Sequence, residues 1–176
     1  MKEKTSEKWL KEGYQYYKCA YYKEASECYD KVLELNPTNI DIWHKKGVIF
    51  TKLERYEESI QCYDKVIELL SKSKTVSIDN LKEIDVQNKN YSKLLVLRYQ
   101  YINSLACKGK YLYKFDCYQE AIECYDKILE ISPDDEYVQS CKDDSLYFLK
   151  LDKARDKYYK RYSNPSPKVD LAECPF

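Results

Sequence analysis

The five-residue stretch ECYDK occurs at residues 27–31 and again at 123–127, and a near copy, QCYDK, lies at 61–65. The middle copy begins 34 residues after the first. The last copy begins one more such period after the middle one when the segment 74–101 is left out of the count. This recurrence predicts an internal repeat that carries a single insertion.

The three glycines of the chain, Gly13, Gly47 and Gly109, fall at one position of this repeat, because each precedes the tyrosine of its copy by the same separation. A glycine inside a helix costs about 1 kcal/mol relative to alanine. A glycine that recurs at one helical position therefore indicates a place where two helices approach too closely for a Cβ atom.

Apolar residues recur around each glycine at spacings of three and four, as Trp9 and Tyr16 do around Gly13, which predicts that each copy begins with a helix. A second apolar series predicts a second helix, which in the first copy carries Ala25, Tyr29, Val32 and Leu33. The motifs NPTN at 36–39 and SPDD at 132–135 combine a helix-ending proline with a polar residue suited to cap the next helix. Ser71 replaces the proline in the second copy, shortly before the insertion.

These features resemble the tetratricopeptide repeat (TPR) family, whose units are helix-turn-helix pairs of 34 residues. The family pattern of Trp, Gly, an aromatic residue, Ala, an aromatic residue and Pro is met by Trp9, Gly13, Tyr16, Ala25, Tyr29 and Pro37. The second unit supplies Trp43, Gly47, Phe50, Ser59 and Tyr63, and the third supplies Leu105, Gly109, Leu112, Ala121, Tyr125 and Pro133. The leucine that the family places before glycine is replaced by Glu12, Lys46 and Lys108, which we expect to weaken that local contact.

The resemblance implies an all-α fold, a right-handed superhelix of three TPR units at 6–39, 40–73 and 102–135 within one domain at 1–162. In the insertion at 74–101 we expect a loop with a short helical turn near 80–86, followed from about residue 90 by a helix of roughly 25 residues. That helix should extend the first helix of the third unit beyond its neighbours. Residues 136–162 are predicted to form a capping helix over the last apolar face, and 163–176 a flexible tail.

The composition is that of a globular interior and a charged surface, with 44% hydrophobic and 34% charged residues and equal numbers of basic and acidic residues, 30 each. Charge is uneven along the chain, because Lys150–Lys168 contains seven basic and two acidic residues, which makes the C-terminal part the basic end. The absence of a long apolar run or an apolar leader predicts a cytoplasmic chain without a membrane partner. We expect its eight cysteines to be reduced thiols, with Cys28, Cys62 and Cys124 packing at one repeat position.

No residue pattern points to catalysis. The chain has a single histidine, His44, its glycines are scattered, and it lacks a Cys-x2-Cys pair. These features provide no glycine-rich phosphate loop, no histidine-based nucleophile and no zinc motif. The sequence therefore predicts a protein that is not an enzyme and uses no metal or cofactor.

The TPR resemblance implies instead that the first helix of each unit lines a concave groove for a partner peptide. The groove residues predicted on this basis are Lys11, Tyr14, Tyr17, Lys18, His44, Lys45, Thr51, Lys52, Asn103, Lys110, Tyr113 and Lys114. A mixture of lysine and tyrosine suits a protein or peptide partner with an acidic segment or a free C-terminal carboxylate. The alternative is that these lysines are ordinary solvated residues.

One TPR subfamily holds the acidic C-termini of heat-shock chaperones through two lysines, two asparagines and an arginine. The matching positions here are Leu10, Tyr14, Lys45, Asn103 and Cys107. Because these residues do not reproduce the subfamily set, the sequence does not predict chaperone binding.

Two further partners follow from the end of the chain. Basic and aromatic residues alternate at Lys150, Lys153, Arg155, Lys157, Tyr158, Tyr159, Lys160, Arg161 and Tyr162. Such mixtures stack bases and neutralise phosphates, so nucleic acid is the alternative partner, although the neutral total charge and the expected packing of these tyrosines on the last repeat disfavour it. The tail, with KVDLAECPF at 168–176, is a candidate occupant of its own groove or a neighbour's, which would make truncation after Ser163 raise partner affinity or abolish self-association.

Overall fold

The computed structural model describes residues 5–72 and 91–162. These ranges contain seven helices and no strand, so the predicted all-α class is confirmed for the described part of the chain. The helices are α1 (Ser6–Lys18), α2 (Tyr22–Leu35), α3 (Ile40–Lys52), α4 (Tyr56–Ser71), α6 (Tyr91–Lys114), α7 (Tyr118–Ile131) and α8 (Glu136–Tyr162). The helical turn expected near 80–86 and the expected tail at 163–176 lie outside the described residues.

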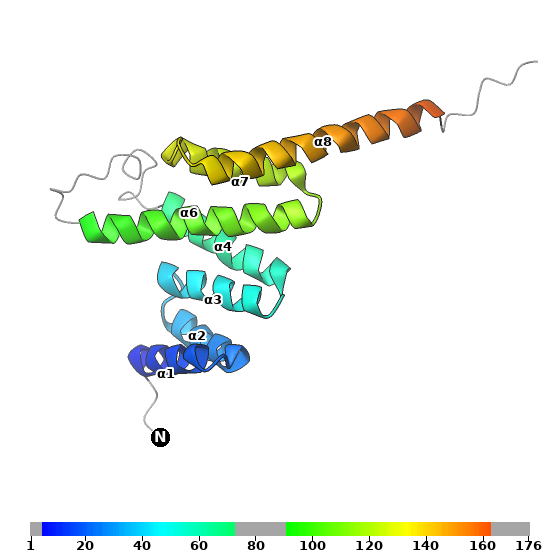
Figure 1. The fold of residues 1–176 in the computed structure, drawn as a ribbon. Coiled ribbons are helices and arrows are strands. Elements are labelled where there is room, and N and C mark those ends of the chain that lie inside the picture. Colours follow the sequence, from blue (N-terminus) through cyan, green and yellow to red (C-terminus); the bar gives the residue numbers. More distant parts are fainter. Residues whose placement is uncertain (1–4, 73–90, 163–176) are drawn as a thin grey trace, which may run out of the picture.

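The helices form a stack of antiparallel pairs, α1 with α2, α3 with α4 and α6 with α7, and α8 closes the series (Figure 1). Each helix packs mainly on the helices before and after it, and α3 also touches α6. This nearest-neighbour arrangement is typical of a repeat superhelix and agrees with the predicted architecture.

The three glycines lie against the tyrosines of the recurring stretch. A Cβ atom on Gly13 would approach Cε1 of Tyr29 to 2.7 Å, and one on Gly47 would approach Cε1 of Tyr63 to 2.6 Å. The Tyr29 and Tyr63 side chains are both 1% exposed, so neither ring can swing out to make room. The close helix approach inferred from the glycine spacing is therefore confirmed.

The turns inside the three pairs also repeat. Ala20, Glu54 and Asp116 have φ angles of 60°, 58° and 60°, in the left-handed region. In the first turn, the backbone N–H of Tyr21 donates to the carbonyl of Tyr16 at 2.9 Å, which closes a Schellman motif. Each first helix therefore ends in the same way, and the turn lets the second helix run antiparallel to the first.

Consecutive pairs are linked by an ion pair that the TPR pattern did not predict. The aspartate of each recurring stretch binds a lysine of the following helix pair or of α8. The three pairs are Asp30–Lys46, Asp64–Lys108 and Asp126–Lys142. Lys46 and Lys108 occupy the position before glycine, where we expected a charge to weaken the packing, and they connect neighbouring units instead.

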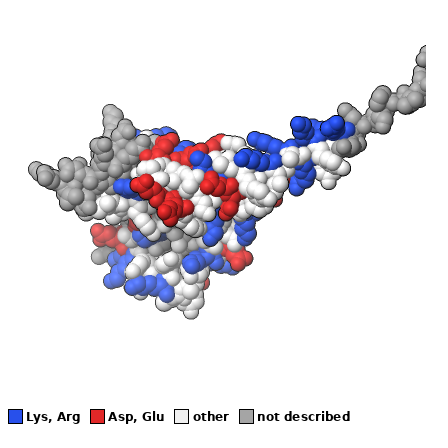
Figure 2. Space-filling model, turned by 45° about the horizontal axis from the view of Figure 1, so that its top comes forward, with Lys and Arg blue, Asp and Glu red and all other residues white. Residues whose placement is uncertain are grey.

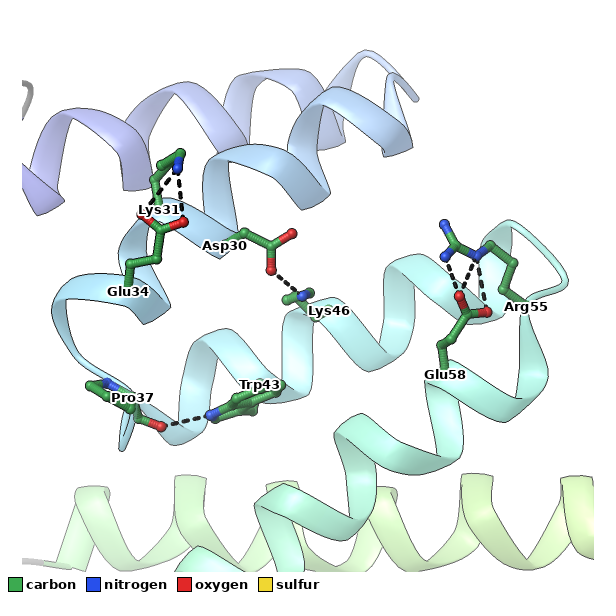
Figure 3. Close-up of polar contacts among 8 residues, drawn as sticks. All are labelled: Asp30, Lys31, Glu34, Pro37, Trp43, Lys46, Arg55 and Glu58. Carbon is green, nitrogen blue, oxygen red and sulfur yellow. Dashed lines mark hydrogen bonds and ion pairs between the residues drawn. The ribbon is translucent and has the colours of Figure 1, made fainter.

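The α2–α3 junction shows how such a link is built (Figure 3). The Lys46 side chain is buried, and its ammonium group lies 5.6 Å and 5.4 Å from the ring centroids of Trp43 and Phe50. The indole N–H of Trp43 donates to the carbonyl of Pro37 at 2.8 Å. The proline turn and the lysine therefore both hold α3 in register on α2.

The long helix α6 extends beyond the stack at its N-terminal end (Figure 1), as predicted. The extension is anchored to its neighbours, because Leu94 is buried and the Arg98 guanidinium donates to the carbonyl of Ile131 at 3.3 Å. The side-chain amide of Gln100 also donates to the carboxylate of Asp41 at 3.3 Å. Part of the insertion thus belongs to the folded stack.

Helix α8 covers the range expected for the capping helix, but only part of it caps. Val138 and Ser145 are buried, and α8 packs mainly against α7. From Lys153 to Arg161 every side chain is exposed, and this end of the helix extends away from the stack (Figure 1).

Candidate functional site

Three adjoining hollows follow one side of the stack, formed by α1, α3, α6 and α8. The N-terminal hollow, of about 340 Å³, is lined by Tyr14, Tyr17, Tyr29, Asp41, His44, Lys45, Val48, Val96, Tyr99 and Gln100. The middle hollow, of about 470 Å³, is lined by Leu95, Arg98, Tyr99, Ile102, Asn103 and Ala106. The C-terminal hollow, of about 310 Å³, is lined by Ala106, Cys107, Lys110, Tyr113, Tyr125, Tyr137, Val138, Cys141 and Asp144.

The three hollows adjoin one another, because neighbouring ones share a residue, and we refer to them together as the groove. Tyr99 lines both the N-terminal and the middle hollow, and Ala106 lines both the middle and the C-terminal hollow. The groove therefore runs from α1 to α8 across the first helices of the successive pairs, and a peptide that follows it would contact every unit.

His44 forms part of the wall of the N-terminal hollow. Its ring centroid lies 6.0 Å from that of Tyr63 and 6.3 Å from that of Tyr99. Its Nε2 atom is buried and has no hydrogen-bond partner among the described residues. Burial lowers the pKa of this imidazole below its usual value, partly opposed by the carboxylate of Asp41, so His44 is neutral at physiological pH.

The charged residues of the same hollow are partly paired. Lys45 forms an ion pair with Asp41 one helical turn earlier, and the Asp41 carboxylate also accepts the amide N–H of Gln100. The Lys45 side chain remains about one-third exposed. It can therefore exchange Asp41 for a carboxylate of a bound ligand without losing a buried contact.

The floor of the middle hollow has its polar groups satisfied within the protein. The side-chain amide of Asn103 donates to the hydroxyl of Tyr99 at 3.0 Å, and its carbonyl oxygen accepts from the thiol of Cys107 at 3.2 Å. Burial raises the pKa of the Cys107 thiol, which disfavours the reactive thiolate form. The exposed apolar atoms here come from Leu95 and Tyr99, which are 40% and 63% exposed.

The C-terminal hollow combines aromatic walls with one charge of each sign. Tyr113 packs edge-on against Phe148 of α8, with ring centroids 5.9 Å apart. Lys110 and Asp144 line the same hollow from α6 and α8, and both are exposed. Such a hollow can hold an apolar side chain and orient a polar or charged group at its rim.

The twelve predicted groove residues divide into two sets. Seven line the hollows: Tyr14, Tyr17, His44, Lys45, Asn103, Lys110 and Tyr113. Five line none of the three: Lys11, Lys18, Thr51, Lys52 and Lys114.

Three members of the second set have contacts within the protein, and one of them is Lys18, whose ammonium group lies 4.8 Å from the ring centroid of Tyr14. Thr51 donates to the carbonyl of Gly47 at 3.0 Å and shares a hydrogen bond with Ser59 at 2.9 Å. The Lys114 ammonium group lies 4.2 Å from the ring centroid of Tyr56 on α4, so this lysine contacts α4 and does not line the groove.

Residues of α8 and of the α6 extension were missing from the sequence-based set. A signal for the α8 residues exists, because Lys142 lies 34 residues after Lys108 and forms the same ion pair. Extending the repeat by this period places Tyr137, Cys141 and Asp144 at the positions of Asn103, Cys107 and Lys110. The α6 extension lies in the insertion, where the repeat period gives no information.

Other kinds of site are not evident in the described ranges. Within residues 5–72 and 91–162, no three His, Cys, Asp or Glu side chains group in a way that could hold a metal ion. The helices in these ranges are too polar or too short for any of them to cross a membrane. The buried thiols of Cys28, Cys62 and Cys124 pack in the core, as predicted.

Comparisons with known proteins match this description. The model of a TPR repeat matches residues 13–53, and two tetratricopeptide repeat models match 40–73 and 108–135. No curated protein matches the chain in sequence.

Solved structures with a similar fold include the first TPR of Spaghetti (RPAP3) bound to the HSP90 peptide SRMEEVD. It is 15% identical with a TM-score of 0.56, and the match covers 82% of this chain and 93% of that one. A MamA crystal structure is 16% identical with a TM-score of 0.38, over 92% of this chain and 97% of that one.

Proposed function

Because the chain belongs to the tetratricopeptide repeat family, we propose that it is a noncatalytic scaffold that binds a segment of a partner protein in its concave groove. The observation that carries this proposal is the row of three adjoining hollows, of which neighbouring ones share Tyr99 and Ala106. Tyrosines along the groove offer apolar area with a polar tip at low entropic cost, which is typical of peptide-binding surfaces.

The chemistry of the groove favours a partner segment with carboxylates. Lys45 and Lys110 stand in the N-terminal and C-terminal hollows, and Lys45 is only partly neutralised by Asp41. A segment that places acidic groups near these two lysines and an apolar side chain between them fits the groove. Asp144 at the C-terminal rim disfavours a further acidic group there.

We do not propose the chaperone tail that occupies the similar Spaghetti structure as the partner of this chain. Asn103 and Cys107, at two of the five positions compared with the chaperone-binding subfamily, bind each other here. Two others are Leu10 and Tyr14, which cannot donate a charged hydrogen bond to a carboxylate.

The test is selection of peptides from a random library, displayed with free C-termini, on the intact chain. We expect acidic peptides to be enriched and to bind with an affinity that falls about tenfold or more in Lys45→Glu and Lys110→Glu variants. Tyr113→Ala should also weaken binding, because it removes one wall of the C-terminal hollow.

Lys127→Glu is the matched control, because Lys127 is an exposed lysine of α7 that lines none of the three hollows. Amidated copies of the selected peptides separate recognition of a terminal carboxylate from recognition of acidic side chains. Enriched peptides whose affinity is the same for the groove variants and the control would show that the groove is not the binding surface.

Nucleic-acid binding by the basic end of α8 is a second candidate function, favoured by one observation. From the sequence we expected Tyr158 and Tyr159 to pack on the last repeat. Instead, they are 59% and 61% exposed. Lysine and arginine side chains gather on the projecting end of the helix (Figure 2). A salt-sensitive mobility shift with random single-stranded RNA would support this function, and no shift at low salt would eliminate it.

A further inference from the structure

The C-terminal hollow carries one available charge of each sign at its rim. Lys110 of α6 and Asp144 of α8 both line it, and both side chains are exposed. Lys45 in the N-terminal hollow is paired with Asp41, but neither Lys110 nor Asp144 forms an ion pair within the described residues. A ligand in this hollow therefore meets a free ammonium group on one wall and a free carboxylate on the other.

The repeat explains why these two charges face the same hollow. Asp144 lies 34 residues after Lys110, at the same repeat position, and the equivalent residues of the first two units are Tyr14 and Val48. Those two residues line the N-terminal hollow. This position therefore faces the groove in every unit and in α8, and the charge that it carries changes sign between α6 and α8.

The space between the two charges is apolar. Tyr125 and Val138, which are 4% and 5% exposed, lie at the bottom of the hollow, and Tyr113 and Tyr137 line it from α6 and α8. A large apolar side chain of a ligand would exchange water for these surfaces. The hollow therefore suits an apolar residue that has charged neighbours on either side.

Beyond Asp144 the surface of α8 remains negative. Asp144 also lines a fourth hollow, of about 470 Å³, together with four more carboxylates that form no ion pair within the described residues. They are Asp134, Asp135, Glu136 and Asp143. Their field adds to that of Asp144, so the α8 side of the C-terminal hollow attracts cations and repels carboxylates. Acidic side chains gather over the body of the molecule in Figure 2, apart from the basic projecting end of α8.

We propose that the partner segment is bipolar, an inference that rests on the proposed peptide-binding function of the groove. A large apolar side chain of the segment occupies the C-terminal hollow, an acidic residue on one side of it pairs with Lys110, and a basic residue on the other side pairs with Asp144. The preference of the groove for carboxylates thus reverses at α8. A uniformly acidic segment would place a carboxylate against Asp144, and this repulsion is what selects the partner.

The first test compares peptide selections on three forms of the full chain: the wild type, Asp144→Lys and Asp156→Lys. Asp156 is an exposed aspartate of the same helix that lines none of the hollows, so it provides the matched control. We expect the wild type and the control to enrich peptides with an acidic residue on one side of a large apolar residue and a basic residue on the other. Asp144→Lys should enrich peptides that are acidic on both sides.

The second test exchanges the charge on both partners. In one peptide selected on the wild type, replacing the basic residue with Glu should lower the affinity for the wild type about tenfold or more. The same replacement should raise the affinity for Asp144→Lys, and both effects should shrink as salt is added. Circular dichroism checks that each variant keeps its helix content, which we expect because Asp144 is exposed.

The outcomes separate this proposal from the proposed function. Peptides whose binding is lost in Tyr113→Ala, but which carry no basic residue, or which are the same for the wild type and Asp144→Lys, would overturn the bipolar partner and leave the groove as the binding surface. A glutamate replacement that weakens binding equally to both proteins would do the same. Failure to select any peptide whose binding depends on Tyr113 or Lys45 would overturn both proposals.

Discussion

Gly47 and Tyr63 illustrate how one position sets the distance between two helices. The Tyr63 ring fills the space that a side chain at residue 47 would need, and its deep burial raises the pKa of its hydroxyl well above the usual value. The same contact recurs between Gly13 and Tyr29. The glycine and the tyrosine therefore act as one packing unit, repeated along the stack.

Gly47→Ala should destabilise the protein. The new Cβ would lie 2.6 Å from Cε1 of Tyr63, and relieving such overpacking costs about 1–3 kcal/mol. The higher helix propensity of alanine returns about 1 kcal/mol, so we expect a net loss. Urea unfolding measures it, with Lys52→Ala, an exposed site on the same helix, as the control. An alanine variant as stable as the wild type would show that the ring can move aside.

His44 should make stability depend on pH. Its folded-state pKa lies below the usual value because of burial, so below about pH 6.5 the unfolded chain binds the proton more readily than the folded one. The contribution of His44 is therefore fully present above that pH and is lost as the pH falls toward the folded-state pKa. The unfolding free energy of the wild type should drop more between pH 7.5 and 5.5 than that of His44→Phe. Equal drops in the two proteins would contradict this.

At the scale of elements, the aspartate–lysine pairs connect one helix pair to the next. Lys46 is buried between Trp43 and Phe50, whereas the side chain of its partner Asp30 is 51% exposed. The link therefore combines a buried cation with a carboxylate that water still reaches. Two residues of the CYDK stretch make these contacts. The tyrosine packs on the glycine of its own unit, and the aspartate binds a lysine of the next unit.

Removing the aspartate of a pair should destabilise the protein more than replacing the buried lysine with an apolar residue. Asp30→Ala leaves the Lys46 ammonium buried without a counter-charge, and we expect a loss of about 1–2 kcal/mol. Lys46→Met keeps the packing on Trp43 and should be close to neutral. In the double variant the effect of Asp30→Ala should nearly vanish, which a double-mutant cycle by urea unfolding measures.

The exposed pair Lys31–Glu34 on the same helix α2 provides the control (Figure 3). Both of its side chains are at least half exposed, so Glu34→Ala should change stability by no more than about 0.5 kcal/mol. A loss for Asp30→Ala as small as this would mean that the inter-unit pairs do not contribute to stacking.

At the scale of the whole molecule, the two halves of α8 have different roles. The first half covers α7 through Val138 and neighbouring side chains, whereas the second half leaves the stack. A chain that ends after Asp152 should keep the unfolding free energy of the full chain within about 0.5 kcal/mol at concentrations where the protein is monomeric. A chain that ends after Asp135 should lose about 2 kcal/mol or more, because it uncovers the apolar face of α7.

Thermal and urea unfolding followed by circular dichroism measure both truncations. Equal stability of the two shortened chains would show that α8 does not cap the stack. A large loss in the chain ending after Asp152 would show that the projecting half contributes to the fold of the monomer.

The sequence by itself determined the fold, because the pattern that specifies a TPR unit is local. Gly13 and Tyr29 lie within the same copy of the repeat, so a single period contains both sides of each helix contact. Nearest-neighbour stacking then repeats this contact, and the boundaries of the pairs follow from the turns. For the same reason, seven of the twelve predicted groove residues line the hollows.

Only the tertiary structure decided the contacts that join residues outside the repeat period. Lys114 shares a helical face with groove residues, but its ammonium group lies over the ring of Tyr56 in the preceding helix pair. Tyr99 reaches the groove from an insertion with no counterpart in the other units. The exposure of the projecting end of α8 likewise depends on the length of α7, since a helix pattern specifies an apolar face but not the element that covers it.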